Sequence, residues 1–270
     1  MPETQPVKNA PERVQSVDRV FTLLERLADA GTSLSLSELA ERTDLPMATI
    51  HRLLRFLVGE GYVYQQESKR YSLGLRMIRL GEAASRGLGT WSMPYLSELV
   101  VRFGETANLA ILQGDACVYI AQVPSPQSVR MFTEVGRVVL PHSTGVGKAM
   151  LSILPDDRVR ELLGRTGMPA RTEHTITNEP DMLEALERAR KLGYTIDDGE
   201  QELGVRCVAV PIEGLPFPAA LSVSGPSSRI GTKDVPQMAP FAQAVAVEIS
   251  EAFRASSRGS RSGGAWQDAS

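Results

Sequence analysis

The order of secondary-structure signals changes once along this chain, near residue 88, and that change limits its possible architectures. Apolar residues at helical spacing dominate before it, whereas short apolar runs typical of strands dominate after it. The 270 residues are enough for two domains of roughly 100–200 residues each. We therefore expect a small, mainly helical N-terminal domain followed by a larger α+β domain.

Three helices are expected in the N-terminal part. Ser16 is placed to cap the first one. Ser35 and Glu38 form a capping box, in which each side chain satisfies a free backbone N–H of the other, and this box opens a second helix. Pro46 suits the first position of a third helix, which covers residues 47–61.

Two short β-rich runs follow, at residues 62–66 and 70–73, and they predict a small hairpin. Three helices with a tight turn between the second and third, followed by a hairpin, is the layout of a winged helix-turn-helix. We assign this domain to residues 14–73 and a linker helix to residues 74–88.

The third helix carries the main signal for nucleic acid, because it has no acidic side chain between Met47 and Val58 and can approach phosphates without like-charge repulsion. Thr49 and Arg52 are placed to reach base edges, and Arg55 to reach a phosphate. The full set of candidate DNA contacts is Ser35, Thr49, His51, Arg52, Arg55, Lys69 and Arg70. The structural alternative is an amphipathic helix with a solvated basic face.

Bulk composition points to an ordinary globular chain, with 42% hydrophobic and 23% charged residues. The net charge of -3 does not indicate nucleic acid, so the DNA prediction rests on local arrangement. We expect a cytoplasmic protein without a membrane segment, whose cysteines Cys117 and Cys207 are reduced. Residues 1–13 and 256–270 have the composition of disordered tails.

The second domain, at residues 89–255, reads as a largely antiparallel sheet with helices on its faces. Gly114 and Asp115 predict a hairpin turn between two of its strands. Its expected strands cover residues 106–113, 116–123, 129–135, 194–197, 205–212 and 218–224. Its expected helices cover residues 94–103, 145–154, 156–164, 180–192 and 234–254.

The stretch HSTGVGKAM, from His142 to Met150, looks like a phosphate loop entering a helix. A phosphate loop also needs an early glycine and a hydroxyl after the lysine, but those positions hold His142 and Ala149. Nucleotide hydrolysis is therefore not expected. What remains is a helix start at which the N–H groups of Gly145 and Val146 can hold a small anion.

Taken together, these stretches resemble the IclR family of bacterial transcriptional regulators, from about Val14 to Arg254. The resemblance in the first domain rests on SVDRVFTLLERLADAG, LSLSELAERTDLPMATIHRLLRFLVGEGYV and RYSLGLRMIRLG. In the second domain it rests on GETANLAIL, LPHSTGVGKAML, LGYTIDDGEQELGVRCVAVPI and ALSVSGPSSR. Within the family, AQVPSPQSVRMFTEVGRVVLPHSTGVGKAM is most similar to regulators of allantoin and purine breakdown.

The resemblance implies a GAF-like sensing domain and a repressor of a catabolic operon, which binds double-stranded operator DNA and is released by a small carboxylate such as glyoxylate or allantoate. It also implies homodimers through the DNA-binding domains, homotetramers through the sensing domains, and no cofactor. Regulation of aromatic acid or glycerol catabolism is the alternative within the family. One departure is that members often begin the recognition helix with Lys-Ser-Thr, where this chain has Met47-Ala48-Thr49.

A carboxylate sensor needs hydrogen-bond donors and few full charges, because a strongly cationic pocket would bind anions indiscriminately. Gly145 and Val146 supply backbone N–H groups, and Ser222 and Ser224 alternate on one strand and so share a face. By the resemblance, Asp197 (through its side chain or its backbone) and Cys207 match positions that hold glyoxylate.

Each of these residues also has a structural interpretation. Without the resemblance, Cys207 in an apolar strand is typical of core packing. The two serines are also consistent with hydrogen bonds to a neighbouring strand, and Asp197 with a turn. His142 is expected to be a structural hydrogen-bonding group, and Lys148 either snorkels or pairs with a carboxylate.

An enzyme is the first alternative of another class, with Cys207 as nucleophile and His142 or His174 as base. No orienting third residue and no G-x-S-x-G motif is evident, so we expect no catalytic or metal-binding residues. The second alternative is a metabolite-binding module whose winged domain serves only for dimerisation.

Overall fold

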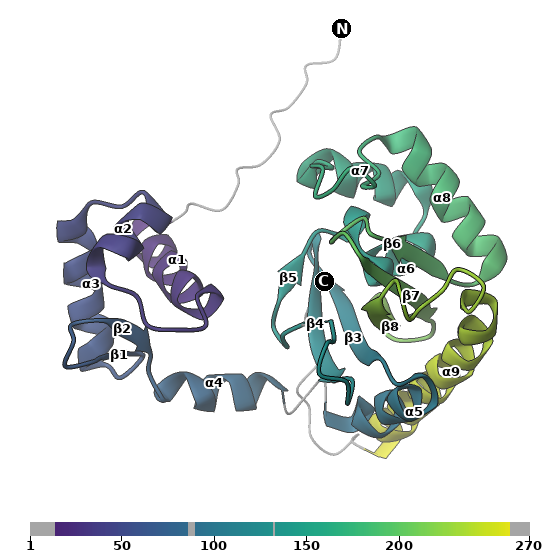
Figure 1. Cartoon of the computed structure of the whole chain (residues 1–270), viewed down its shortest axis with the longest axis horizontal. Helices are drawn as coiled ribbons and strands as arrows, with labels where there is room; N and C mark the ends of the chain where they lie inside the picture. Colours follow the sequence, from purple (N-terminus) through teal and green to yellow (C-terminus); the bar gives the residue numbers. More distant parts are fainter. Residues whose placement is uncertain (1–13, 86–89, 132, 260–270) are drawn as a thin grey trace, which may run out of the picture. The chain divides into compact units, whose positions relative to one another are not determined.

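Three helices and a two-stranded hairpin form the first unit of the computed structural model, which describes residues 14–85, 90–131 and 133–259 (Figure 1). The helices are α1 (Gln15–Asp29), α2 (Leu36–Thr43) and α3 (Met47–Gly59), and the strands are β1 (Val63–Gln65) and β2 (Tyr71–Leu73). This confirms the winged helix-turn-helix. A helix, α4 (Arg76–Ser85), lies where the linker helix is predicted, and all of it except Ser85 falls in the first unit, which ends at Ala84.

Leucine and isoleucine side chains from all three helices form the core of this unit, with Leu23, Leu39, Ile50 and Leu54 fully buried. The capping box is present, since the amide of Ser35 donates to Glu38 Oε2 at 2.6 Å and the amide of Glu38 donates to Ser35 Oγ at 3.2 Å.

Two predicted helix starts are wrong. Ser16 lies inside α1, because the carbonyl of Val14 accepts from the amides of Val17 and Asp18 and starts the helix without a side-chain cap. Pro46 is the N-cap residue of α3 and not its first helical residue, because its ψ of 134° is extended.

The second unit, residues 85–270, is built on one antiparallel sheet with strand order β5-β4-β3-β8-β7-β6. The strands are β3 (Thr106–Gln113), β4 (Ala116–Val123), β5 (Val138–Val139), β6 (Thr195–Asp198), β7 (Val205–Ile212) and β8 (Ala219–Pro226). The helices are η1 (Thr90–Ser92), α5 (Met93–Phe103), η2 (Pro141–Ser143), α6 (Gly145–Ser152), α7 (Asp156–Thr166), α8 (Glu179–Leu192) and α9 (Val235–Gly259). This is the predicted α+β architecture.

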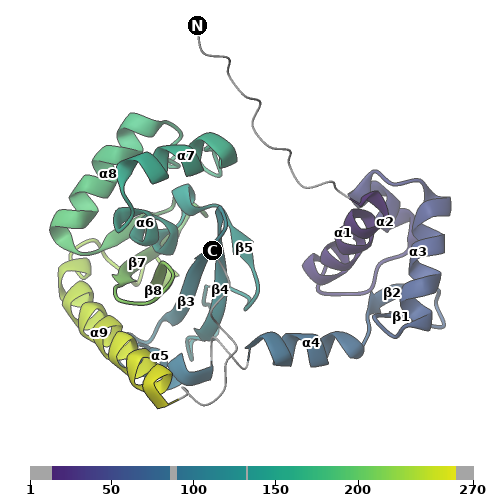
Figure 2. The same cartoon turned by 180° about the vertical axis from the view of Figure 1, so that it is seen from behind.

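Helices cover both faces of the sheet (Figures 1 and 2). On one face, α5 and α9 pack against large apolar residues of the central strands, such as Leu109, Val210 and Leu221. On the other face, α6 packs against small ones, such as Ala110, Ala209 and Ala220, and α7 and α8 form a further cluster beyond it. The small residues leave room for α6 to lie close to the strands.

Two expectations for the second unit are corrected. No strand forms within the described part of residues 129–135; the side chains of Val129 and Val135 are exposed, and the pair beside β4 is made by β5 instead. The predicted tail at 256–270 starts too early, because α9 continues to Gly259. Some predictions fall on residues outside the described part of the chain, which are 1–13, 86–89, 132 and 260–270. These are the predicted N-terminal tail, the end of the predicted linker helix and the part of the predicted C-terminal tail after Gly259.

Candidate functional site

The exposed face of α3 carries three basic side chains that are free of intramolecular partners. The side chains of His51, Arg52 and Arg55 are exposed, and none of these side chains takes part in a hydrogen bond or ion pair with another described residue. Ile50, Leu54 and Leu57 occupy the opposite, buried face. Thr49 is only half-exposed and lies toward the flank of the helix, so it is less accessible than Arg52.

Two of the predicted DNA contacts are used inside the domain. Arg70 on the hairpin donates to the carbonyl of Ser33 at 2.6 Å and forms an ion pair with Glu38 at 3.0 Å. Ser35 caps α2, and together with Arg70 it holds the pKa of Glu38 at about 2, well below its usual range. Lys69, in contrast, is exposed at the hairpin turn with a φ of 61° and has no side-chain partner among the described residues.

The predicted effector residues come together on the face of the sheet that α6 covers. Strand pairing places Asp197 opposite Cys207, and Cys207 opposite Ser224. Directly opposite residues in antiparallel strands share a face, so these three side chains form one row. Ser222 belongs to the next row, and its Oγ lies 3.4 Å from that of Ser224.

These two rows continue onto β3 through residues that the sequence did not single out. Thr106 lies opposite Ser224, and Asn108 lies opposite Ser222, with Asn108 Nδ2 3.4 Å from Ser222 Oγ. Both residues are buried. The signal that could have identified them is a buried asparagine inside the otherwise apolar run TANLAIL.

The start of α6 faces this polar surface. Thr144 caps the helix, since its Oγ1 accepts from the amide of Gly147 at 3.1 Å. The amides of Gly145 and Val146 have no acceptor among the described residues, as expected for the first turn of a helix. A Cβ on Gly145 would lie 2.8 Å from Cys207 Sγ, so the glycine allows the helix start to contact β7.

Burial raises the pKa of both ionisable groups in the first row. Burial raises the pKa of Asp197 to about 6, although hydrogen bonds from the amides of Glu200 and Gln201 to its Oδ1 partly oppose this shift. Burial, together with the charge of Asp197, raises the pKa of Cys207 to about 12. A thiol with such a pKa is a poor nucleophile but retains its proton for hydrogen bonding.

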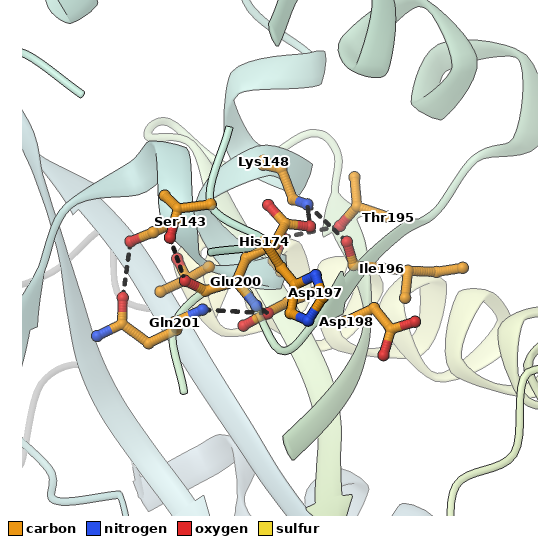
Figure 3. A network of polar contacts seen from close by, with 12 residues as sticks. Ser143, Lys148, His174, Thr195, Ile196, Asp197, Asp198, Glu200 and Gln201 are labelled. Atoms are coloured by element: carbon orange, nitrogen blue, oxygen red, sulfur yellow. Dashed lines mark hydrogen bonds and ion pairs between the residues drawn. The ribbon is translucent and has the colours of Figure 1, made fainter. Parts of the chain in front are cut away.

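A buried ion pair lies beside Asp197 (Figure 3). Lys148 Nζ, on α6, donates to Glu200 Oε1 and, at 2.6 Å, to the carbonyl of Ile196 on β6. Both charged side chains are nearly inaccessible. Of the two alternatives for Lys148, the structure therefore shows pairing with a carboxylate, and Glu200 is a further residue that sequence reasoning did not identify.

His142 has the structural role expected of it. Its Nε2 lies 3.0 Å from the carbonyl of Pro169, and burial lowers the pKa of the ring, so the neutral ring donates this hydrogen bond. The ring of His142 is held by Pro169 and the side chain of His174 is exposed, so neither histidine is arranged as a general base for Cys207. Among the described residues, no group of three or more His, Cys, Asp or Glu side chains is arranged to hold a metal ion.

Comparison with known proteins gives matches over most of the chain. The family model for the IclR helix-turn-helix domain matches residues 16–67, and that for the bacterial transcriptional regulator IclR C-terminal domain matches residues 83–251. The acetate operon repressor of Salmonella typhimurium is 38% identical over 249 residues, covering 89% of this chain and 90% of that protein. The HTH-type transcriptional repressor AllR of Escherichia coli K12 is 34% identical over 233 residues, covering 84% and 85%.

Solved structures show the same fold. A putative transcriptional regulator from Rhodococcus sp. RHA1 superposes with a TM-score of 0.76 at 28% identity, covering 90% of this chain and all of that one. No helix in the described part of the chain is long and apolar enough to cross a membrane.

Proposed function

This chain belongs to the IclR family of bacterial transcriptional regulators, and we propose that it is a repressor that binds operator DNA through α3 and is released by a small carboxylate. The observation that carries the proposal is the exposed basic face of α3, where His51, Arg52 and Arg55 are left without intramolecular partners. Exposed basic side chains without intramolecular partners are available to contact DNA phosphates and base edges. Membership in a family of regulators agrees with the expectation that the protein is not an enzyme.

The proposed DNA contacts fall into two groups, according to whether the side chain is free or already bound within the domain. Arg52 reads a base edge, and Arg55 and Lys69 contact phosphates, because all three side chains are exposed. Arg70 and Ser35 instead hold the hairpin and the start of α2 in place through Glu38.

The effector binds between the first turn of α6 and the serines of β8. The amides of Gly145 and Val146, the hydroxyls of Ser222 and Ser224 and the thiol of Cys207 supply neutral donors, and Asp197 adds another where it is protonated, below about pH 6. Neutral donors suit one carboxylate, because no uncompensated positive charge is buried with it. Lys148 is already neutralised by Glu200.

The resemblance to allantoin-type regulators makes glyoxylate or allantoate our first choice of effector, and purine degradation our first choice of pathway. The acetate operon repressor is more similar to this chain than AllR, at 38% against 34% identity, so a small oxoacid of another pathway is the second choice. A thermal-shift screen against small oxoacids, allantoate, aromatic acids and glycerol metabolites separates these, since a specific ligand raises Tm by mass action. Stabilisation by an aromatic acid alone would contradict the purine assignment.

We further propose a cytoplasmic protein that forms homodimers through its DNA-binding domains and homotetramers through its sensing domains. The apolar side chains of Val14, the N-cap residue of α1, and of Val17 and Phe21 on α1 are 49–60% exposed and follow one another at helical spacing. Such a stripe is suited to a second copy of the chain. Sedimentation equilibrium tests this, and a monomer at micromolar concentration would exclude it.

Replacing Arg52 tests the DNA-binding half of the proposal. Arg52→Ala should weaken specific operator binding by about 1–3 kcal/mol, because a bidentate contact to a base is lost. Fluorescence anisotropy with a labelled operator measures the change, and effector binding serves as the control for folding. Unchanged operator affinity would remove Arg52 from this role.

Replacing both serines tests the effector half. The double variant Ser222→Ala, Ser224→Ala should lose the response to effector, because two buried donors are removed, while operator binding in the absence of effector is retained. Operator release is followed by anisotropy as effector is added. A full response in this variant would show that the effector binds elsewhere.

A further inference from the structure

The first turn of α3 presents apolar side chains to solvent on the same face as the free basic ones. Met47 is 50% exposed and Ala48 is exposed. At 100° per residue, Ala48 lies one turn before Arg52 on the helix surface, and Met47 lies one turn before His51. The face therefore begins with two apolar side chains and continues with three basic ones.

Apolar side chains at this position have one matching group on the base edges of a DNA major groove. The C5-methyl of thymine is apolar, whereas the other groups that bases expose there are hydrogen-bond donors or acceptors. Neither Met47 nor Ala48 can donate or accept a strong hydrogen bond, and the flexible thioether of Met47 can adapt to the position of a methyl group.

Helix geometry limits where these methyl groups lie. Four residues along a helix span about 6 Å, whereas base pairs are stacked about 3.4 Å apart. A thymine in contact with Ala48 therefore lies within about two base pairs of the base that Arg52 reads.

A contact with another protein is the competing use of an exposed apolar pair, and the charge of the surrounding face disfavours it. His51, Arg52 and Arg55 lie on the same face, which carries no acidic side chain from Met47 to Val58. A protein interface over this face would bury three basic groups without intramolecular partners, and burying unpaired charge is costly. A phosphate-rich groove with apolar methyl groups on its floor matches both parts of the face.

We propose that Met47 and Ala48 select thymine at one or two positions of each operator half-site by contacting its C5-methyl group in the major groove. The inference rests on the proposed DNA-binding function and adds to it the base that the first turn of α3 reads.

Replacing thymine by uracil tests the inference, because it removes the methyl group and leaves base pairing unchanged. An operator duplex is first selected with the full-length protein from a random pool. Each thymine of a half-site is then replaced singly by deoxyuridine, and Kd is measured by anisotropy. We expect a loss of about three- to fivefold at one or two positions, the size of one buried methyl group.

Protein variants assign the effect to its residues. The variants Met47→Ser and Ala48→Gly should bind the thymine and uracil duplexes with equal affinity at the positions they read. Arg55→Ala is the matched control, since the loss of a phosphate contact should weaken binding to both duplexes while the ratio between them stays the same. Circular dichroism and Tm confirm that the variants are folded.

Two outcomes would overturn the inference, and they differ in what else they affect. Specific duplex binding with no uracil-sensitive position within two base pairs of the Arg52 contact, or with a ratio unchanged in both variants, rejects methyl reading and leaves the proposed function intact. Failure of the full-length protein to select any duplex sequence rejects both.

Discussion

At the scale of single residues, a buried carboxyl group sets the electrostatics of the sensing site. The pKa of Asp197 is raised to about 6 by burial, while Lys148 and the amides of Glu200 and Gln201 favour its charged form. Glu200, whose pKa is also raised by burial, Cys207 and Tyr119 are further ionisable neighbours. The protonated Asp197 can donate a hydrogen bond to a carboxylate, whereas the ionised form repels it.

Effector affinity should therefore depend on pH. For a carboxylate that is fully ionised above pH 5, affinity should fall as pH rises through about 6, by at most about tenfold per pH unit for one coupled proton. Asp197→Asn keeps the Oδ1 acceptor for both amides and cannot ionise, so its affinity should be independent of pH in this range. Isothermal titration between pH 5 and 8 measures both proteins. An equally steep pH dependence in the variant would assign the coupling to another group.

Asp197 also makes the free energy of unfolding depend on pH. Because the folded-state pKa of Asp197 lies above the unfolded value near 3.8, the folded state binds the extra proton between about pH 4 and 6. The stabilisation from this group is therefore present below that window and is lost as pH rises through it.

Residue type alone does not separate the basic side chains of the DNA-binding domain. Arg52, Arg55 and Arg70 are all candidate DNA contacts by sequence, yet Arg70 is held by Ser33 and Glu38. That distinction depends on contacts between segments more than thirty residues apart, which spacing along the chain does not reveal.

At the scale of elements, the short helix α6 has two roles. Its first turn offers the amides of Gly145 and Val146 to the sheet, while Lys148 holds β6 through the carbonyl of Ile196 and the loop after β6 through Glu200 (Figure 3). That loop in turn supplies the amides that hydrogen-bond to Asp197. The ion pair therefore positions both sides of the proposed effector site.

Removing one partner of this ion pair should be costly. Lys148→Met at pH 8 should lower the free energy of unfolding by about 3–5 kcal/mol, because Glu200 is left buried and charged. The double variant Lys148→Met, Glu200→Gln should recover much of that loss. Urea denaturation measures both variants, and equal destabilisation would show that packing of the lysine, not its charge, is what matters.

Glycine has a separate role at each of two positions in this helix. A Cβ on Gly147 would lie 2.2 Å from the carbonyl oxygen of Pro141, whereas one on Gly145 would meet the Sγ of Cys207. The lack of a side chain at Gly147 lets the η2 backbone lie close to α6, and the lack of one at Gly145 lets β7 lie close to it. The resemblance of G-V-G-K to a phosphate loop thus reflects close packing at a helix start that is also suited to an anion.

At the scale of the whole molecule, the proposed function requires that the sensing and DNA-binding units be energetically coupled. The two units have separate cores, one formed by α1 to α3 with the hairpin and one by the six-stranded sheet with its helices. We propose that effector binding changes how sensing domains associate and that α4 transmits this to the spacing of two recognition helices, since operator half-sites fit only one spacing.

Thermodynamic linkage gives this coupling a direct test. If the effector weakens operator binding by some factor, saturating operator must weaken effector binding by the same factor, typically about 5–150-fold. Isothermal titration of effector into the free protein and into its operator complex measures this factor. Identical effector affinities in the two titrations would exclude the mechanism.

The sequence by itself determined the two-domain order, the capping box at Ser35, the winged helix-turn-helix and the family, because these depend on local periodicity, on caps and on motifs read along the chain. It also placed Ser222 and Ser224 on one face, since alternation along a strand is local.

Only the tertiary structure decided which groups meet. Strand pairing sets Asp197, Cys207, Ser224 and Thr106 in one row, and folding brings Glu200 to Lys148. Arg70 forms an ion pair with Glu38, whereas the side chain of Arg52 has no partner among the described residues. Burial then moves the pKa of Asp197 to about 6. These properties arise from contacts between distant segments and from exclusion of water, and neither is encoded in any short stretch of the chain.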